Sequence, residues 1–184
     1  MILVIGGKNS GKSRFAEGLA VNGGKDRRYY LATMKVCDEA GRKRIKRHRK
    51  QREGKGFITI ELQYGIDRAI QMMDEPENSV VLLECVANLV GNELYDNPER
   101  EWHRGCLNEN CVMEDAGCEL FADAVLKDIC SLEERAGLLI AVSSEYHVNE
   151  DMNKDVDECT RMYIELLDRV NTRLIECADR VYRM

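Results

Sequence analysis

A glycine-rich segment that follows a short apolar run near the N-terminus constrains the fold most strongly. Residues 2–5 are aliphatic and mostly β-branched, as in a buried strand, and residues 6–13 read Gly-Gly-Lys-Asn-Ser-Gly-Lys-Ser. This segment fits the pattern G-x-x-x-x-G-K-[ST], whose glycines let consecutive backbone N–H groups point at phosphate oxygens. A strand before it and a helical pattern after it distinguish it from an ordinary glycine-rich turn. The segment therefore predicts a phosphate-binding loop, the P-loop.

The positions of this loop have expected roles in binding a nucleoside triphosphate. Lys12 is expected to reach the β- and γ-phosphates, and the Ser13 hydroxyl to bind Mg²⁺. The nucleotide-binding candidates in the loop are Gly6, Gly7, Lys8, Asn9, Ser10, Gly11, Lys12 and Ser13. A magnesium site also needs a carboxylate, and Glu84 follows an apolar run that reads as a strand. The alternative for Glu84 is an ordinary acidic residue at a strand end, and Asp38 and Glu61 are weaker candidates for the metal.

Strand and helix patterns alternate along the chain. Strands are expected at residues 2–5, 29–32, 57–60, 80–83, 137–142 and 181–182. Helices are expected at residues 13–21, 38–52, 66–73, 120–132 and 156–178. A polar stretch at about residues 92–118 is expected to form a loop or insertion. The alternation predicts one α/β domain over residues 1–184, with a mostly parallel sheet and helices on both faces.

Composition and net charge argue against several classes of protein. The net charge of −6 argues against bulk nucleic-acid binding. No apolar run approaches the ~20 residues that span a membrane, and the N-terminus lacks a signal-peptide pattern. The eight cysteines are therefore expected to be reduced thiols in the cytoplasm.

Four potential zinc ligands lie close together at His103, Cys106, Cys111 and Cys118. Their spacing matches no recognised pairing of zinc ligands. Unpaired thiols are therefore the favoured interpretation.

A strongly basic run is the second unusual feature. Eight of the eleven residues from Arg42 to Arg52 are Lys or Arg. On a helix, Arg44, His48 and Arg52 are spaced four apart and share one face. Neighbouring positive charge lowers the pKa of an imidazole, and the neutral imidazole is the nucleophilic form, which suits a histidine that attacks phosphorus. From the pattern alone, a solvated basic helix with an incidental histidine is the simpler interpretation, and an RNA-contacting patch is a second alternative.

Several separated stretches resemble, in order, the bifunctional adenosylcobinamide kinase/adenosylcobinamide-phosphate guanylyltransferase family. They are residues 2–14, 30–33, Arg44-Ile45-x-x-His48-Arg49-x-x-Arg52, 59–61, 82–85, Asn92, 169–171 and 178–181. The resemblance implies a RecA-like P-loop fold and an enzyme that phosphorylates adenosylcobinamide with ATP or GTP. It further implies transfer of GMP from GTP through a phosphoramidate on His48.

The resemblance also assigns site residues and partners. His48 and Lys12 would be catalytic, and Ser13 and Glu84 would hold Mg²⁺. Nucleotide contacts outside the P-loop would come from Ala32, Thr33, Arg44, Arg49, Arg52, Glu61 and Glu84. The implied partners are a nucleoside triphosphate, a corrinoid and further copies of the chain in a small homo-oligomer such as a trimer, with no nucleic acid.

The sequence departs from the family pattern in both halves of the chain. Residues 143–146 read Ser-Ser-Glu-Tyr where the family carries Thr-Asn-Glu-Val, and Glu53 stands where the family usually has proline.

Two other functions remain open from the sequence. One is a P-loop kinase of another small metabolite, which would form no covalent nucleotide. The other is a nucleotide-dependent regulatory or RNA-binding protein.

Overall fold

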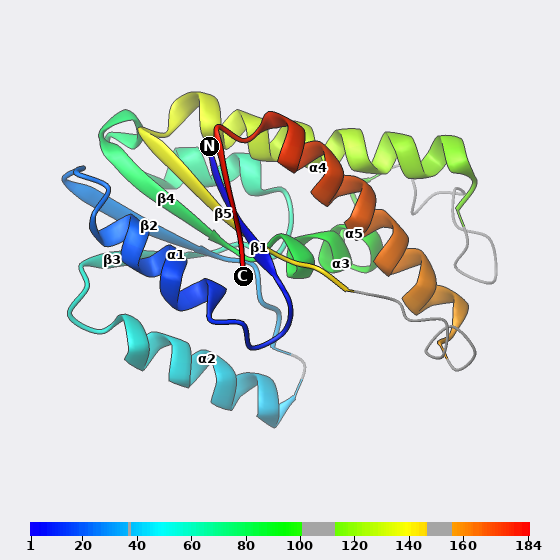
Figure 1. Cartoon of the computed structure of the whole chain (residues 1–184), viewed down its shortest axis with the longest axis horizontal. Coiled ribbons are helices and arrows are strands. Elements are labelled where there is room, and N and C mark those ends of the chain that lie inside the picture. The colour runs from blue at the N-terminus through cyan, green and yellow to red at the C-terminus, as the bar shows by residue number, and fades with distance from the viewer. Residues whose placement is uncertain (37, 101–112, 147–155) are drawn as a thin grey trace.

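Six parallel strands form a single sheet in the computed structural model, which describes residues 1–36, 38–100, 113–146 and 156–184 (Figure 1). The strands are β1 (Ile2–Gly6), β2 (Arg27–Ala32), β3 (Phe57–Glu61), β4 (Ser79–Glu84), β5 (Leu138–Ser144) and β6 (Arg180–Arg183). Their order in the sheet is β3-β2-β4-β5-β1-β6, and every neighbouring pair is parallel. The expected α/β fold with a mostly parallel sheet is confirmed.

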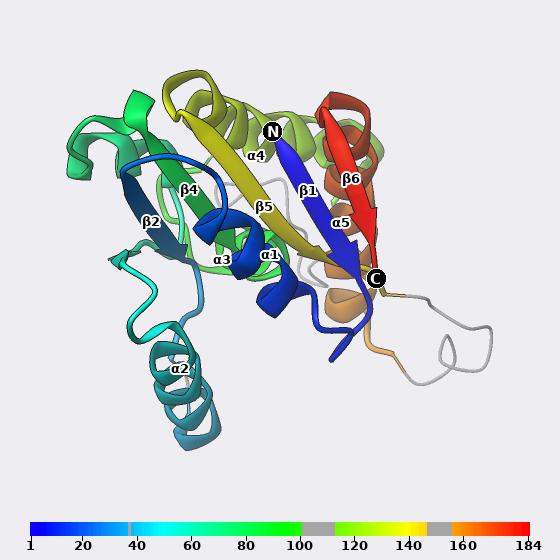
Figure 2. The ribbon, with the colours of Figure 1, turned by 60° about the vertical axis from the view of Figure 1, so that its left-hand side comes forward.

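Helices cover both faces of this sheet. They are α1 (Lys12–Val21), α2 (Glu39–Arg52), α3 (Val86–Tyr95), α4 (Asp115–Arg135) and α5 (Glu158–Cys177), with 3₁₀ helices η1 (Ile66–Met72) and η2 (Pro76–Asn78). Figure 2 shows α1 on one side of the sheet and α3, α4 and α5 on the other. No helix in the described ranges is both long enough and apolar enough to cross a membrane.

Successive strand residues pack into two separate apolar layers. In β5, Leu139 and Ala141 join the larger layer with α3, α4 and α5, whereas Ile140 and Val142 join the smaller layer under α1. Alternate side chains of a strand point to opposite faces, so a strand covered on both faces reads as a continuous apolar run. Burial on both faces explains why the apolar runs in the sequence located the central strands correctly.

Helix α2 lies outside both layers (Figure 1). Among its described residues only Gly41 and Arg52 are buried, because the helix is polar around most of its circumference. Asp38 caps its N-terminus, with Oδ1 accepting a hydrogen bond of 2.6 Å from the Gly41 N–H. The carboxylate of Asp38, one of the weaker magnesium candidates, therefore has a structural partner.

The two ends of the stretch expected as a polar insertion, about residues 92–118, are helical. Helix α3 continues to Tyr95 and α4 begins at Asp115, while residues 101–112 lie outside the described part. Segment 66–72 is a 3₁₀ helix rather than an α-helix. Several polar residues at the start of the 92–118 stretch are buried, and Glu93 is one of them.

Of the four potential zinc ligands, only Cys118 falls within the described residues. It is buried on α4, where its Sγ lies 3.7 Å from the Met113 carbonyl oxygen and 3.9 Å from the Met162 sulfur. The described part of the chain contains no group of three or more side chains that could hold a metal ion through histidine, cysteine or carboxylate ligands.

Candidate nucleotide-binding and nucleophile site

The P-loop joins β1 to α1 in a tightly fixed conformation. Gly11 has a φ of +92°, which a residue without Cβ adopts readily. Lys12 Nζ donates a hydrogen bond of 2.8 Å to the Gly7 carbonyl, and the Glu145 N–H donates one of 3.1 Å to the Gly6 carbonyl. A Cβ on Gly6 would overlap the carbonyl oxygen of Met184. The loop is therefore held between the ends of β5 and β6.

This loop forms one wall of a cavity of about 990 Å³. The other lining residues come from the first turn of α1, from helix α2 and from the end of β5. The full lining is Lys8, Asn9, Ser10, Gly11, Lys12, Ser13, Arg14, Lys43, Arg44, Arg47, His48, Gln51, Ser144 and Tyr146. Cations from three elements converge on this space, which favours a phosphate-rich ligand.

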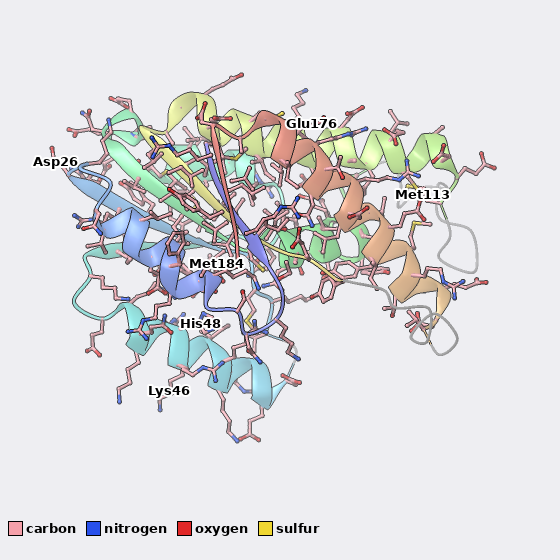
Figure 3. The ribbon with its side chains drawn as sticks, viewed as in Figure 1. Asp26, Lys46, His48, Met113, Glu176 and Met184 are labelled. Atoms are coloured by element: carbon pink, nitrogen blue, oxygen red, sulfur yellow. The ribbon has the colours of Figure 1, made fainter. Side chains whose placement is uncertain are left out.

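His48 lies half-buried on the side of α2 that faces α1, whereas Lys46 projects away from it (Figure 3). Burial is the largest cause that lowers the pKa of His48 below its usual value, followed by the positive charges of Arg44, Arg52 and Arg47. The carboxylate of Glu17 acts in the opposite direction. The sequence indicated the effect of the charges but not the burial, which depends on α2 folding back over α1.

Ser13 and Glu84 meet at the floor of the site. Ser13 Oγ donates a hydrogen bond of 2.7 Å to Glu84 Oε1, while the buried Oε2 has no hydrogen-bond partner among the described residues. Burial raises the pKa of Glu84 to about 7, and the hydrogen bond from Ser13 and the charge of Lys12 oppose this shift. A hydroxyl and a carboxylate are hard oxygen donors of the kind that Mg²⁺ binds, and an ion would satisfy the unpaired oxygen. These two residues therefore fit a magnesium ion.

A second, smaller cavity of about 40 Å³ lies between α2 and the carboxyl ends of β2, β3 and β4. It is lined by Tyr30, Ala32, Met34, Arg44, Ile45, His48, Arg49, Arg52, Thr59, Glu61, Glu84 and Asn88. Arg44 and His48 line this cavity and the P-loop cavity alike. The imidazole therefore stands at the boundary between the two spaces.

Two arginines of the smaller cavity anchor α2 to the sheet. Arg49 forms an ion pair with Glu61, the last residue of β3. Arg52 is buried with its guanidinium 3.4 Å from the centre of the Tyr30 ring, and its Nη1 has no hydrogen-bond partner among the described residues. A buried donor without a partner is costly, so this nitrogen is suited to receive an acceptor from a ligand.

Most of the residues expected at the site do come together, but Thr33 is not brought to either cavity. Its side chain is buried and bonds both backbone groups of Cys85, donating to the carbonyl and accepting from the N–H at 2.8 Å each. Asn92 is also buried, and its Nδ2 donates to the Thr33 carbonyl at 2.7 Å and to the Gln63 carbonyl at 2.9 Å. Both residues hold the strand ends that shape the site.

Sequence reasoning missed several residues that the fold places here. Glu17 on α1 is almost fully buried, and its Oε2 lies 2.5 Å from Lys55 Nζ, just beyond α2. Asn88 lines the smaller cavity from α3, a helix that was not among those expected from the sequence. Glu17 lies four residues after Ser13, so the two share one face of α1, and this spacing is the local hint of its position.

Comparison with known proteins places this chain in a family. Residues 2–184 match the family model described as cobinamide kinase / cobinamide phosphate guanyltransferase. The chain is 28% identical over 186 residues to the bifunctional adenosylcobalamin biosynthesis protein CobU of Salmonella typhimurium, covering 99% of this chain and 93% of that protein. It is 43% identical over 96 residues to the Escherichia coli protein of the same name, covering 52% of this chain and 51% of that protein, so this second match spans about half of each.

A distant structural likeness is to the crystal structure of the flagellar accessory protein FlaH from Methanocaldococcus jannaschii. The two share 14% sequence identity with a TM-score of 0.40, over 83% of this chain and 64% of that one. The family model, in contrast, spans nearly the whole sequence. The chain belongs to the cobinamide kinase / cobinamide phosphate guanyltransferase family.

Proposed function

We propose that this protein phosphorylates adenosylcobinamide and then transfers GMP from GTP to the phosphorylated product through a covalent intermediate on His48. Family membership supports the two activities. The main structural support for the proposal is that His48 and the P-loop line one cavity. A nucleotide whose phosphates lie on the loop would therefore have a nucleophile within the same space.

In the kinase step, the residues of this chain bind and orient the phosphates. The backbone N–H groups of the P-loop and the Lys12 ammonium would hold the β- and γ-phosphates of ATP or GTP. Mg²⁺ held by Ser13 and Glu84 would offset negative charge on the phosphates when bound. The hydroxyl oxygen of the acceptor bonds to the γ-phosphorus, the bond to the β–γ bridging oxygen breaks, and the nucleoside diphosphate leaves.

In the guanylyl transfer, His48 acts as the nucleophile. Its lowered pKa keeps the imidazole neutral near pH 7, which leaves a nitrogen lone pair free to attack the α-phosphorus of GTP. Pyrophosphate leaves, and GMP stays on the imidazole as a phosphoramidate. A phosphate oxygen of the corrinoid then attacks the same phosphorus, the P–N bond breaks, and His48 is restored. Arg44 and Arg47, which line the cavity beside His48, would hold the departing phosphates.

The proposal also covers the nucleotide contacts outside the P-loop and the oligomeric state. The nucleotide-contact candidates Arg49, Arg52 and Glu61 line the smaller cavity, which shares His48 with the P-loop cavity. We also propose a small homo-oligomer, such as a trimer, which sedimentation equilibrium measures directly. No nucleic-acid partner is part of the proposal.

The test follows two labels through the reaction. Purified protein is incubated with cobinamide and GTP labelled at either the γ- or the α-phosphate, beside the variants Lys12→Ala and His48→Ala. Transfer of γ-label to the corrinoid should require Lys12 but survive loss of His48, whereas transfer of α-label should require His48. The matched control is Lys46→Ala, which removes a cation from the same helix on the side facing away from the site (Figure 3).

Each alternative function gives a different result in this assay. A P-loop kinase of another metabolite would leave cobinamide unlabelled by either route. A polyanion-binding regulator would show salt-dependent RNA binding that Lys46→Ala weakens as much as His48→Ala does. Either outcome would contradict the proposed function.

A further inference from the structure

The P-loop cavity has two chemically different walls. Helix α2 supplies Lys43, Arg44, Arg47 and His48 on one side. The end of β5 supplies Ser144 and Tyr146, neither of which is charged. Figures 1 and 2 show the P-loop between helix α2 and the chain that leaves β5. The cationic wall suits phosphates, whereas the β5 wall offers one hydroxyl group and one aromatic ring.

Ser144 is held firmly beside the loop. It pairs with Gly6 in the sheet register, and the next residue donates its N–H to the Gly6 carbonyl. On the other side, the buried Asn171 of α5 accepts a hydrogen bond of 2.5 Å from Ser143 Oγ and donates one of 3.0 Å to the Ser144 carbonyl. These bonds fix the backbone at Ser144 and leave its side chain lining the cavity. A side chain on a backbone held in this way can keep a reacting group in a fixed position.

Tyr146 is a supported but exposed aromatic ring. It is 48% exposed, and its ring lies edge-to-face with Tyr163 at a centroid distance of 6.1 Å. Tyr163 is itself held by a hydrogen bond of 3.0 Å from its hydroxyl to the Ala87 carbonyl on α3. A large ring kept against a cavity by a second, anchored ring offers apolar contact area with little ordering cost.

We propose that Ser144 and Tyr146 form the acceptor side of the P-loop cavity, with Tyr146 packing against the apolar face of the corrinoid and Ser144 donating a hydrogen bond to the phosphoryl group in transit. The inference rests on the proposed function and assigns the place of its second substrate. The cavity of about 990 Å³ is at the upper end of the range for small-molecule sites, which leaves room for an acceptor beside the triphosphate.

The assignment separates the two reactions in space. In phosphorylation, the acceptor hydroxyl oxygen bonds to the γ-phosphorus as the bond to the β–γ bridging oxygen breaks, and the hydroxyl proton passes to solvent. Ser144 then serves the γ-phosphoryl group on the β5 side, whereas His48 serves the α-phosphorus on the α2 side. Loss of either β5 residue should therefore impair phosphorylation and spare the formation of the guanylylated enzyme.

The experiment measures both reactions on the same variants. Tyr146→Ala should raise the KM for cobinamide about tenfold, the equivalent of one lost aromatic contact, without changing the KM for GTP. Tyr146→Phe keeps the ring and should behave like the wild type. Ser144→Ala should lower the kcat of phosphorylation about tenfold, as expected for one lost hydrogen bond to a charged group. Self-labelling with α-labelled GTP should stay at the wild-type rate in all three.

The contrary results are specific. An unchanged KM for cobinamide in Tyr146→Ala, or a parallel fall of self-labelling in Ser144→Ala, would refute the acceptor-side role of these residues. The activities of the wild type would be unaffected by either result. A wild-type protein that neither phosphorylates cobinamide nor takes up label would overturn the proposed function together with this inference. Thermal unfolding of each variant checks that the fold is retained.

Discussion

Replacing Asn92 with alanine is expected to lower the free energy of unfolding by about 3 kcal/mol. The side chain lies on α3 and is only 8% exposed. Its amide nitrogen bonds two backbone carbonyls, those of Thr33 and Gln63, which follow β2 and β3. The asparagine thus ties together two strand ends that shape the smaller cavity.

The magnitude follows from the two acceptors that would be left. Each buried carbonyl without a partner costs about 1–2 kcal/mol, and the truncation removes packed atoms as well. For a domain of this size, about 3 kcal/mol corresponds to a fall of about 6–12 °C in Tm. Urea unfolding followed by circular dichroism measures the free energy, and a thermal scan measures the Tm.

Asn22 provides the matched control. It is an exposed asparagine whose amide also donates to a backbone carbonyl, that of Gly18 at 2.9 Å. Asn22→Ala should change the free energy of unfolding by about 0.5 kcal/mol or less, because water replaces the lost bond at the surface. If the two substitutions cost the same, burial of the Asn92 bonds is not what stabilises the strand ends.

Two further predictions concern the pH dependence and the loop. Because the positive charge of Arg44 lowers the pKa of His48, Arg44→Ala should raise that pKa and move the acid limb of the self-labelling rate to higher pH; Lys46→Ala should not, and an unchanged limb in Arg44→Ala would show that the charge does not reach the imidazole. Gly6→Ala should lower the free energy of unfolding by about 1–3 kcal/mol, because its Cβ would overlap backbone, whereas a Cβ on Gly7 meets nothing within 4 Å. Equal stability of the two glycine variants in urea would refute the close approach.

The parts of the site that sequence located are those with local signals. The P-loop needs a strand, glycines and a helix start within a dozen residues, so its pattern is visible without the fold. Glu84 was found because it ends a buried apolar run, and the run defines a strand. The basic residues around His48 are likewise adjacent in sequence. Their effect on its pKa could be foreseen, although burial is the larger cause.

The parts that sequence missed depend on distant partners. The C-terminal end of helix α3, from Asn92 onward, was hidden because its polar residues are buried through bonds to remote groups, as Glu93 is by the Gly65 N–H at 2.7 Å. A polar residue with an unseen partner reads as surface or loop, so the segment was interpreted as an insertion. Thr33 was expected at the nucleotide, but its hydroxyl bonds the Cys85 backbone, 52 positions away in the chain. Long-range pairings of this kind leave no periodic pattern.

If His48 carries the nucleotide during guanylyl transfer, GMP should be covalently bound to the denatured protein. The protein is incubated with Mg²⁺ and α-labelled GTP, denatured, and compared with His48→Ala. Because the chain has three histidines, the variant His103→Ala/His147→Ala serves as the matched control. Alkali-stable, acid-labile label is expected on the wild type and on the double variant, and none on His48→Ala. Label that persists in His48→Ala, or a wild type that binds GTP without taking up label, would contradict this role of His48.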